Sequence, residues 1–400
     1  MTTYSAVVTT GIYCRPGCGA RPLPQNTRTF ELAATAEAAG FRACHRCRPY
    51  RVAGPVGSNP PEIVCEAVQL IIGGVLDNCG TEIALAAQVG MSPRHLRRLF
   101  LTHLGATPDQ FARSRRAHFA RRLLDDTDLT ILDVAFASGF GSLRQFNRTM
   151  HQVFNDSPAS LRGRRHQADR LAADGGLALR LPVAPGYDWA AVRSFLAARA
   201  IPGVEVLDGD TYRRTITVAG SPGLLEVSPG DTAGPAGEYL LLRAHLPYWE
   251  GLIHIVERVA RVLGSDADHA ADIAAVRADP VLGALAATSP GSPVPGAWDP
   301  FEAGVSTILS GRPGREQRLR KFVARLGTPV HGLPIGLTST FPDVMTVTPA
   351  ALARAGLPDA DAGAIARLAE TLSAGGAVRI DPGNWLPRHR RPLAASGISG

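Results

Sequence analysis

The chain has 400 residues and a formal net charge of +7, with 45% hydrophobic and 19% charged residues. A chain of this length exceeds one ordinary hydrophobic core and indicates about two to four domains. The composition excludes a mostly disordered protein, and no apolar run approaches the roughly 18 residues that a membrane-spanning helix requires.

The positive charge is concentrated at the beginning of the chain. Residues 1–51 carry seven arginines against two acidic residues, residues 52–170 carry fourteen against eleven, and residues 171–400 have a net charge of −1. A polyanionic partner is therefore expected to bind within residues 1–170. Every basic residue except Lys321 is an arginine, whose planar guanidinium group offers paired donors to phosphate.

Residues 1–51 form a Cys- and Arg-rich unit. The segment Tyr4–Thr10 contains the β-branched residues typical of a strand. The segment Thr35–Gly40 predicts a short helix with Thr35 as its cap and Gly40 as its stop. So small a unit can bury only a small hydrophobic core, which favours a bound metal ion as an additional source of stability. Residues 52–61, VAGPVGSNPP, have the composition of a linker.

Residues 62–166 are predicted to be helical throughout. Helical patterning is carried by four segments, at residues 63–76, 81–90, 107–124 and 131–139. Two of the short helices end in glycine and are followed by a second helix that Ser92 or Ser142 caps. This order of features returns after roughly 50 residues and indicates an internal repeat of helix–turn–helix type.

The chain changes pattern after a second polar linker at residues 167–176. Strands are predicted at residues 177–183, 212–218, 223–227 and 239–246, with one helix at residues 189–198. From Trp249 onward the pattern is helical again.

Four of the six cysteines form two close pairs, Cys14 with Cys18 and Cys44 with Cys47. Four thiolates satisfy tetrahedral Zn²⁺, and short spacers allow both members of a pair to face one ion. The spacing predicts one four-cysteine zinc site, which is either purely structural or reactive. The other two cysteines, Cys65 and Cys79, lie in apolar helical surroundings and are expected to be core thiols.

The motifs TTGIYCRPGC at residues 9–18 and GFRACHRCRP at residues 40–49 resemble the N-terminal module of Ada, the regulator of the adaptive response to alkylation damage. The resemblance implies that Cys14 accepts a methyl group from a methylated DNA phosphotriester. It also implies that Cys18, Cys44 and Cys47 complete the zinc site with Cys14. By the same resemblance, contacts to the DNA phosphate backbone are expected from three residues, Thr10, Arg21 and Arg42.

A tetrathiolate zinc site carries a formal charge of −2, and transfer of a methyl group to one sulfur lowers it to −1. Repulsion of DNA phosphate then decreases, so one methylation can strengthen DNA binding. Since nothing regenerates the thiolate, each molecule is expected to act once.

The segments ALAAQVGMSPRHLRRLF at residues 84–100 and ILDVAFASGFGSLRQFNR at residues 131–148 resemble the two helix–turn–helix motifs of AraC-type regulators. Two such motifs on one chain can enter adjacent major grooves, about 34 Å apart. Arginine can read guanine there, and glutamine can read adenine. The candidate base-reading residues are Arg94, His95, Arg97, Arg98, Ser142, Arg144, Gln145 and Arg148.

Residues 177–400 resemble the AlkA-type 3-methyladenine DNA glycosylases of the helix–hairpin–helix superfamily. The segments that carry the resemblance are RLP at 180–182, PGYDW at 185–189, GSPVPGAWDPFE at 291–302 and LARAG at 352–356. Such enzymes flip a damaged base into a pocket where an aspartate supports cleavage of the glycosidic bond.

The chain departs from that family where the chemistry is expected. The hairpin motif and the catalytic aspartate should follow residue 385, but residues 384–400 read NWLPRHRRPLAASGISG. The segment SGRPGREQR at residues 310–318 stands where the family inserts an apolar wedge into DNA. Asp299 and Asp343 are expected to have cap or surface roles rather than to replace the missing aspartate. The glycosylase half is therefore expected to be truncated and inactive.

The expected fold class is multidomain, α + β. It consists of a small four-cysteine zinc domain at residues 1–51, an all-α double helix–turn–helix domain at 62–166, a β-rich domain similar to the AlkA N-terminal domain at 177–248, and a helical glycosylase-like domain with an incomplete helix–hairpin–helix region at 249–400.

Three functions remain open at this stage. The first is an alkylation repair regulator that irreversibly transfers a methyl group to Cys14, with double-stranded DNA, specific promoter sites and RNA polymerase as partners. The second is an active 3-methyladenine DNA glycosylase that the N-terminal domains deliver to DNA. The third is a transcription factor with structural zinc. No signal peptide is recognisable, so the expected location is the cytoplasm, in association with the nucleoid.

Overall fold

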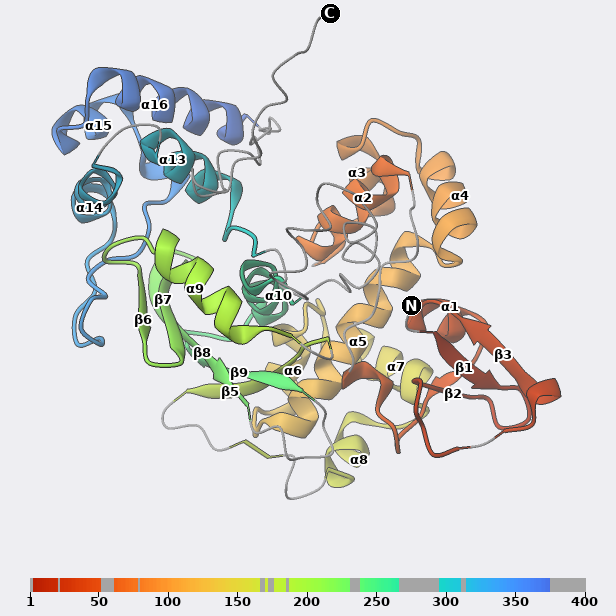
Figure 1. Cartoon of the computed structure of the whole chain (residues 1–400). Coiled ribbons are helices and arrows are strands. Elements are labelled where there is room, and N and C mark those ends of the chain that lie inside the picture. The colour runs from red at the N-terminus through yellow and green to blue at the C-terminus, as the bar shows by residue number, and fades with distance from the viewer. Residues whose placement is uncertain are drawn as a thin grey trace, which may run out of the picture. The chain divides into compact units, whose positions relative to one another are not determined.

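The computed structural model describes residues 3–20, 22–51, 61–77, 80–165, 170–171, 176–184, 187–230, 238–265, 295–310 and 314–374 (Figure 1). The chain divides into two compact units. The first comprises Met1–Leu196 with Leu225–Gly296, and the second comprises Ala197–Leu224 with Ala297–Gly400. Arg21, Cys79, most of both predicted linkers and the stretch 384–400 lie outside the described residues. Within the described residues, no helix combines the length and the apolar character needed to cross a membrane.

Residues 3–51, here called the N-terminal module, contain a four-stranded sheet in the order β3-β1-β2-β4. Its strands are β1 Tyr4–Val7, β2 Ile12–Cys14, β3 Thr27–Phe30 and β4 Arg42–Ala43. Strand β1 runs antiparallel to β2 and β3, whereas β2 and β4 are parallel. The sequence predicts only β1 of these four strands.

Helix α1, Ala33–Ala38, connects β3 to β4 and so allows β4 to run parallel to β2. The predicted cap at Thr35 is wrong, because the helix begins two residues earlier, after Leu32. The Thr35 hydroxyl instead donates a hydrogen bond to the Leu104 carbonyl oxygen at 2.8 Å. A contact outside the module has thus replaced the local cap.

Residues 61–165, here called the helix–turn–helix domain, contain only helices and their connections. The helices are α2 Glu62–Ile72, α3 Glu82–Gln88, α4 Pro93–Leu104, α5 Pro108–Asp126, α6 Ile131–Ala137, α7 Leu143–Phe154 and α8 Pro158–Gly163. Every helix predicted in this part is present, and only α8 was not expected. Long helix α5 is buried along most of its length, because α1, α2, α6, α7 and α8 pack against it.

The internal repeat is visible in the helix caps. The hydroxyl groups of Ser92 and Ser142 accept hydrogen bonds from the backbone NH groups of His95 and Gln145, at 3.3 and 3.2 Å. These two bonds confirm the predicted N-caps of α4 and α7. The turn glycines Gly90 and Gly139 have φ angles of +68° and +78°, which favour glycine over other residues.

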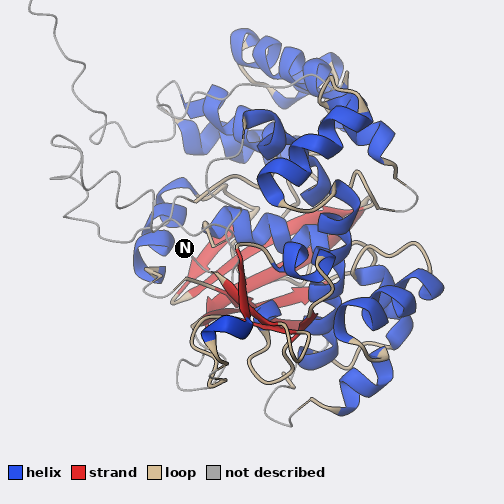
Figure 2. Cartoon of the chain, turned by 90° about the vertical axis from the view of Figure 1, so that its right-hand side faces the viewer, coloured by secondary structure: helices blue, strands red, loops and turns tan. Residues whose placement is uncertain are grey.

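The strands after residue 176 form a second sheet in the order β5-β9-β8-β7-β6 (Figure 2, red). Its strands are β5 Leu177–Pro182, β6 Glu205–Asp208, β7 Thr211–Val218, β8 Ser221–Pro229 and β9 Tyr239–His245. The boundary between the two units falls within β8. Only β6 was not predicted. The predicted helix at residues 189–198 is α9, Trp189–Arg199.

The described residues after β9 contain α10 Leu252–Leu263 in the first unit, and α13 Pro300–Ser310, α14 Arg315–Leu326, α15 Pro349–Ala355 and α16 Asp359–Ser373 in the second. Asp299 accepts a hydrogen bond from the Glu302 NH at 2.8 Å, and Asp343 accepts one from the Met345 NH. Both aspartates therefore have the cap role that the sequence indicated.

The second unit contains a buried ionic cluster around Arg214 of β7, whose side chain is 2% exposed. Its guanidinium group lies 2.7 Å from Glu302 and 3.2 Å from Glu205, and it is 4.3 Å above the ring of Trp298. Burial raises the pKa of Glu302 to about 7, although the charge of Arg214 opposes that rise.

We expect Arg214→Met to destabilise the second unit by about 3–5 kcal/mol, because it leaves two acidic side chains buried without their cation. The adjacent Arg213 is a matched control, since its ion pair with the exposed Asp208 contributes less than about 1 kcal/mol. Hydrogen exchange in β7 and α13 measures both changes. Equal effects of the two substitutions would contradict the importance of the buried cluster.

Candidate metal centre and nucleic-acid interface

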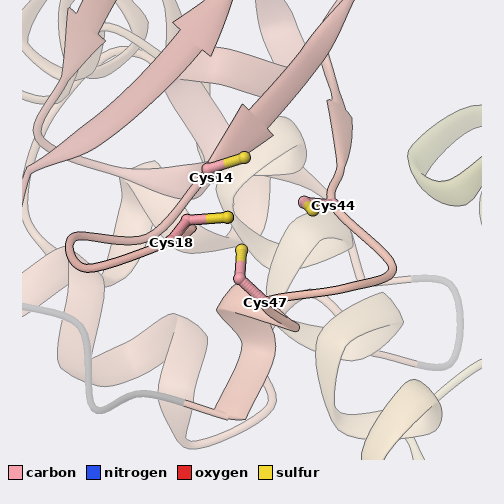
Figure 3. Close-up of side chains that lie close together, drawn as sticks. All are labelled: Cys14, Cys18, Cys44 and Cys47. Atoms are coloured by element: carbon pink, nitrogen blue, oxygen red, sulfur yellow. The ribbon is translucent and has the colours of Figure 1, made fainter. Parts of the chain in front are cut away.

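Four cysteine sulfurs of the N-terminal module lie together, as the sequence predicts. The Sγ atoms of Cys14, Cys18, Cys44 and Cys47 are all within 4.8 Å of one another and turn toward a common centre (Figure 3). In an ideal tetrahedral Zn–S4 site, neighbouring sulfurs are about 3.8 Å apart. The four-sulfur cluster therefore needs little adjustment to hold one Zn²⁺.

Strand pairing brings the two cysteine pairs together. Cys14 ends β2, Cys44 directly follows β4, and the Cys44 NH donates a hydrogen bond to the Tyr13 carbonyl oxygen at 3.0 Å. The parallel pairing of β2 with β4 thus places one cysteine of each pair at the same end of the sheet. Tight turns then return Cys18 and Cys47 to that end. The first passes through Gly17 at φ +74°, and the second is closed by a hydrogen bond from the Arg48 NH to the Cys44 carbonyl oxygen at 3.1 Å.

The chemistry of the four thiols also fits a cation. Burial raises the pKa of Cys14 to about 12, and a hydrogen bond from Cys47 lowers the pKa of Cys44 to about 4. Without a cation, ionisation of several thiols so close together is unfavourable, because it brings like charges together. A divalent cation removes this penalty and allows all four to be thiolates.

Two of the three predicted phosphate-contacting residues lie on or next to the strands that lead to Cys14 and Cys44. Thr10 lies in the exposed turn before β2, and Arg42 is a partly buried residue of β4, whose NH donates to the Gly11 carbonyl oxygen at 2.8 Å. The third, Arg21, lies outside the described residues. Burial lowers the pKa of His45, and Arg42 is the largest electrostatic contributor to that decrease. The positive charge of Arg42 therefore acts on His45, which directly follows Cys44.

Two polar clusters join the N-terminal module to α5, and sequence reasoning missed both. The hydroxyl of Tyr13, next to Cys14, donates to Glu37 at 2.7 Å, and Glu37 also lies 2.6 Å from Nε2 of His118. The hydroxyl of Tyr50 donates to the buried Asp125 at 2.9 Å. These pairs are far apart in the chain, so no local pattern could have revealed them.

The candidate base-reading residues lie on α4 and α7. Arg94, Arg97 and Arg98 are exposed on α4, and Ser142, Arg144 and Arg148 are exposed at the cap and along α7. His95 and Gln145 are half-buried. The Ser142 hydroxyl is already engaged as the α7 cap, and His95 Nδ1 lies 2.9 Å from a guanidinium nitrogen of Arg98.

Cys65 was predicted to be a buried core thiol, and this prediction is wrong because the residue is only partly buried. Cys65 lies on α2 and is only partly buried, because the fully buried face of that helix carries Val64, Ala67, Val68 and Ile71 instead. Cys79 lies outside the described residues.

Three family models match the chain. The metal binding domain of Ada matches residues 2–50, a helix–turn–helix domain matches residues 85–164, and the AlkA N-terminal domain matches residues 178–299. The fold, the four-sulfur cluster and these three matches together define a multidomain α + β protein. It combines a zinc module, a helix–turn–helix domain and a glycosylase-like region.

Curated relatives extend this result to most of the chain. The "probable bifunctional transcriptional activator/DNA repair enzyme AlkA" of Mycobacterium tuberculosis is 37% identical over 346 residues, which cover 85% of this chain and 68% of that protein. The "bifunctional transcriptional activator/DNA repair enzyme Ada" of Escherichia coli is 36% identical over 149 residues, covering 36% of this chain and 41% of that protein. The chain belongs to the family of AlkA-type bifunctional transcriptional activator/DNA repair enzymes.

Solved structures include the 3-methyladenine DNA glycosylase of Archaeoglobus fulgidus, at 17% identity and a TM-score of 0.40, with 48% of this chain and 66% of that chain covered. The methylated N-Ada/DNA complex is 40% identical at a TM-score of 0.13, with 29% of this chain and 84% of that chain covered.

The match to the metal binding domain of Ada and the four-sulfur cluster assign one zinc ion to Cys14, Cys18, Cys44 and Cys47. Since a helix–turn–helix domain is a DNA-binding module, DNA is the partner of the helix–turn–helix domain.

Proposed function

We propose that the chain repairs alkylated DNA and regulates transcription in response. Its Cys14 irreversibly accepts a methyl group from a DNA methylphosphotriester, and the methylated protein binds promoter DNA more tightly. The proposal is carried by the four-sulfur cluster, whose Sγ atoms lie within 4.8 Å of one another in a module that matches the metal binding domain of Ada. A cytoplasmic location and RNA polymerase as a further partner follow from this proposal.

The transfer is a nucleophilic substitution at the methyl carbon. The Cys14 sulfur forms a bond to that carbon while the ester C–O bond breaks, and the electron pair of the broken bond stays on the phosphate oxygen. The products are a cysteine thioether and an ordinary phosphodiester. Bound Zn²⁺ keeps the sulfurs as thiolates at neutral pH. Thr10 and Arg42 of the same module are proposed to hold the DNA backbone.

The chain itself supplies the regulatory signal. Conversion of the Cys14 thiolate into a thioether leaves three negative sulfurs instead of four, so DNA phosphates meet less repulsion at the N-terminal module. The S–C bond of a thioether is stable in water, so the thiolate is not regenerated and each molecule transfers one methyl group.

The test is incubation of the full chain with DNA that carries labelled methylphosphotriesters, followed by intact mass measurement and peptide mapping. A gain of one methyl group on the Cys14 peptide is expected. Cys14 is only 7% exposed, whereas Cys18, Cys44 and Cys47 are more accessible, so mapping is essential. A methyl group on another peptide would contradict the assignment, and no gain with zinc bound would leave a structural zinc site.

Sequence-specific binding is proposed to depend on the exposed arginines of α4 and α7. We expect Arg144→Ala to weaken binding to the preferred DNA about tenfold and to relax specificity at one base pair. Arg42→Ala should weaken binding to all sequences alike and reduce the salt dependence by about one ion. Arg113→Ala is the matched control, since Arg113 lies on α5 and pairs with Asp109. Titration of preferred and unrelated duplexes at several salt concentrations separates these effects.

A second candidate function is excision of 3-methyladenine. It is favoured by the match of residues 178–299 to the AlkA N-terminal domain. Chromatography of alkylated DNA incubated with the chain detects released base directly. Release without methylation of the protein would favour this function over the first, and release with methylation would establish both.

A further inference from the structure

Helix α10 packs against the helix–turn–helix domain, beside α5 and α6 (Figure 1). It lies in the stretch that matches the AlkA N-terminal domain, so the contact joins two parts that separate family models describe. We propose that His254 and Glu257 dock α10 on the helix–turn–helix domain and thereby position the second helix–turn–helix motif on DNA. This inference rests on the DNA binding in the proposed function and goes beyond methyl transfer.

His254 is held by two acceptors of the helix–turn–helix domain. Its Nδ1 lies 2.9 Å from the carbonyl oxygen of Ile72, at the end of α2, and its Nε2 lies 2.7 Å from a carboxylate oxygen of Asp77. A carbonyl oxygen can only accept a hydrogen bond, so Nδ1 donates. One side chain of α10 thus bridges two points of the domain.

Asp77 connects this contact to α5. One of its carboxylate oxygens forms an ion pair with Arg116, at 3.1 Å from Nε. Arg116 is 5% exposed, and a different nitrogen of its guanidinium group donates a hydrogen bond to the Leu76 carbonyl oxygen at 2.9 Å. The fit is close, since a Cβ atom on Gly74 would lie 2.9 Å from the His254 ring. The segment around Gly74 and Asp77 is thus fixed between α10 and α5.

The same cluster supports the turn of the second motif. A Cβ atom on Gly139, the turn glycine between α6 and α7, would lie 2.5 Å from the Asp77 carboxylate. The NH of Gly251, just before α10, donates to the carbonyl oxygen of Phe136 near the end of α6, at 3.3 Å. Because this turn sets the direction of α7, a shift of α10 changes where α7 presents Arg144 to DNA.

A second polar contact allows the docking to be tested by exchange of charges. Glu257 of α10 lies 2.8 Å from Arg115 of α5, with side-chain exposures of 30% and 18%. Further along α5, Arg122 donates to the carbonyl oxygen of Arg180 in β5, and Arg180 pairs with Asp126 at 2.8 Å. Two elements of the AlkA-type stretch, α10 and β5, therefore rest on one face of α5.

The experiment uses the full chain and duplex DNA selected from a random library by the wild-type protein. The base pairs read by the second motif are those that the wild-type protein protects in a DNA footprint and that Arg144→Ala leaves unprotected. A second duplex carries other base pairs at these positions. The affinity for the selected duplex divided by the affinity for this second duplex measures the contribution of the second motif. We expect that ratio to fall about tenfold in Arg115→Glu and in Glu257→Arg, and to recover when both substitutions are combined.

The two single variants change the charge in opposite directions, so a simple charge effect on DNA binding would weaken one and strengthen the other. That result would overturn the proposal, as would failure of the double variant to restore the ratio. His254→Gln should lower the ratio as well, and His331→Gln is its control at an exposed histidine of the second unit.

Hydrogen exchange of α10 and residues 72–77 without DNA reports the docking independently. Exchange should rise in both single variants and return to the wild-type level in the double variant. Unchanged exchange in the single variants would overturn the docking. Absence of sequence preference in the wild-type chain would instead refute the DNA binding in the proposed function and leave the docking to be judged by exchange.

Discussion

We expect Cys14→Ala to abolish methyl uptake from methylated DNA while the purified chain still contains zinc. The substitution removes the proposed nucleophile, and the remaining sulfurs of Cys18, Cys44 and Cys47 can hold the metal with water in the fourth position. Intact mass after incubation with methylphosphotriester DNA, together with metal analysis, checks both parts. The loss should be complete rather than partial, because alanine offers no sulfur at this position to accept the methyl group.

Cys65→Ala is the matched control, since Cys65 lies on α2 outside the four-sulfur cluster. It should take up one methyl group per molecule, as the wild type does. Cys14→Ala also lacks one thiolate charge, as the methylated protein does, so it should bind promoter DNA more tightly than the unmethylated wild type. Full methyl uptake by Cys14→Ala with zinc retained would show that another sulfur is the acceptor.

Much of the local structure could be predicted from the sequence, because short-range hydrogen bonds decide it. Ser92 and Ser142 cap α4 and α7 as predicted, and each needs only a backbone NH three residues ahead. The four-sulfur cluster was predictable for a similar reason. Close cysteine pairs have few other roles in a chain that does not depend on disulfides.

Contacts between distant segments could not be predicted in this way. Parallel pairing of β2 with β4 unites the cysteine pairs, yet a two-residue strand such as β4 has no periodicity to detect. Thr35 has the residue type of a cap, but it bonds to Leu104, which is 69 residues away. His254 and Asp77 are 177 residues apart, so their pairing depends on how the complete first unit packs.

Removal of zinc is expected to unfold the N-terminal module while the helix–turn–helix domain remains helical. Structural zinc in small modules supplies about 10–16 kcal/mol of apparent binding free energy. The module buries only a few large side chains, among them Tyr4, Tyr13 and Tyr50, and a core of that size contributes only a few kcal/mol. Without the metal, ionisation of the clustered thiols also brings like charges together.

Hydrogen exchange before and after treatment with a chelator measures this effect, with metal analysis to confirm that zinc has left. Protection should be lost in β1, β2 and β4, persist in α4 and α7, and return when zinc is restored. Cys65→Ala, which leaves the four-sulfur cluster intact, should show the same loss and return of protection as the wild type. When the module unfolds, Tyr50 leaves Asp125, but Arg121 of the same helix still pairs with that buried carboxylate. Helix α5 therefore keeps an ion pair for this carboxylate. If the N-terminal module stays protected from hydrogen exchange after complete zinc removal, its contacts with α5 are sufficient to keep it folded, and the prediction is wrong.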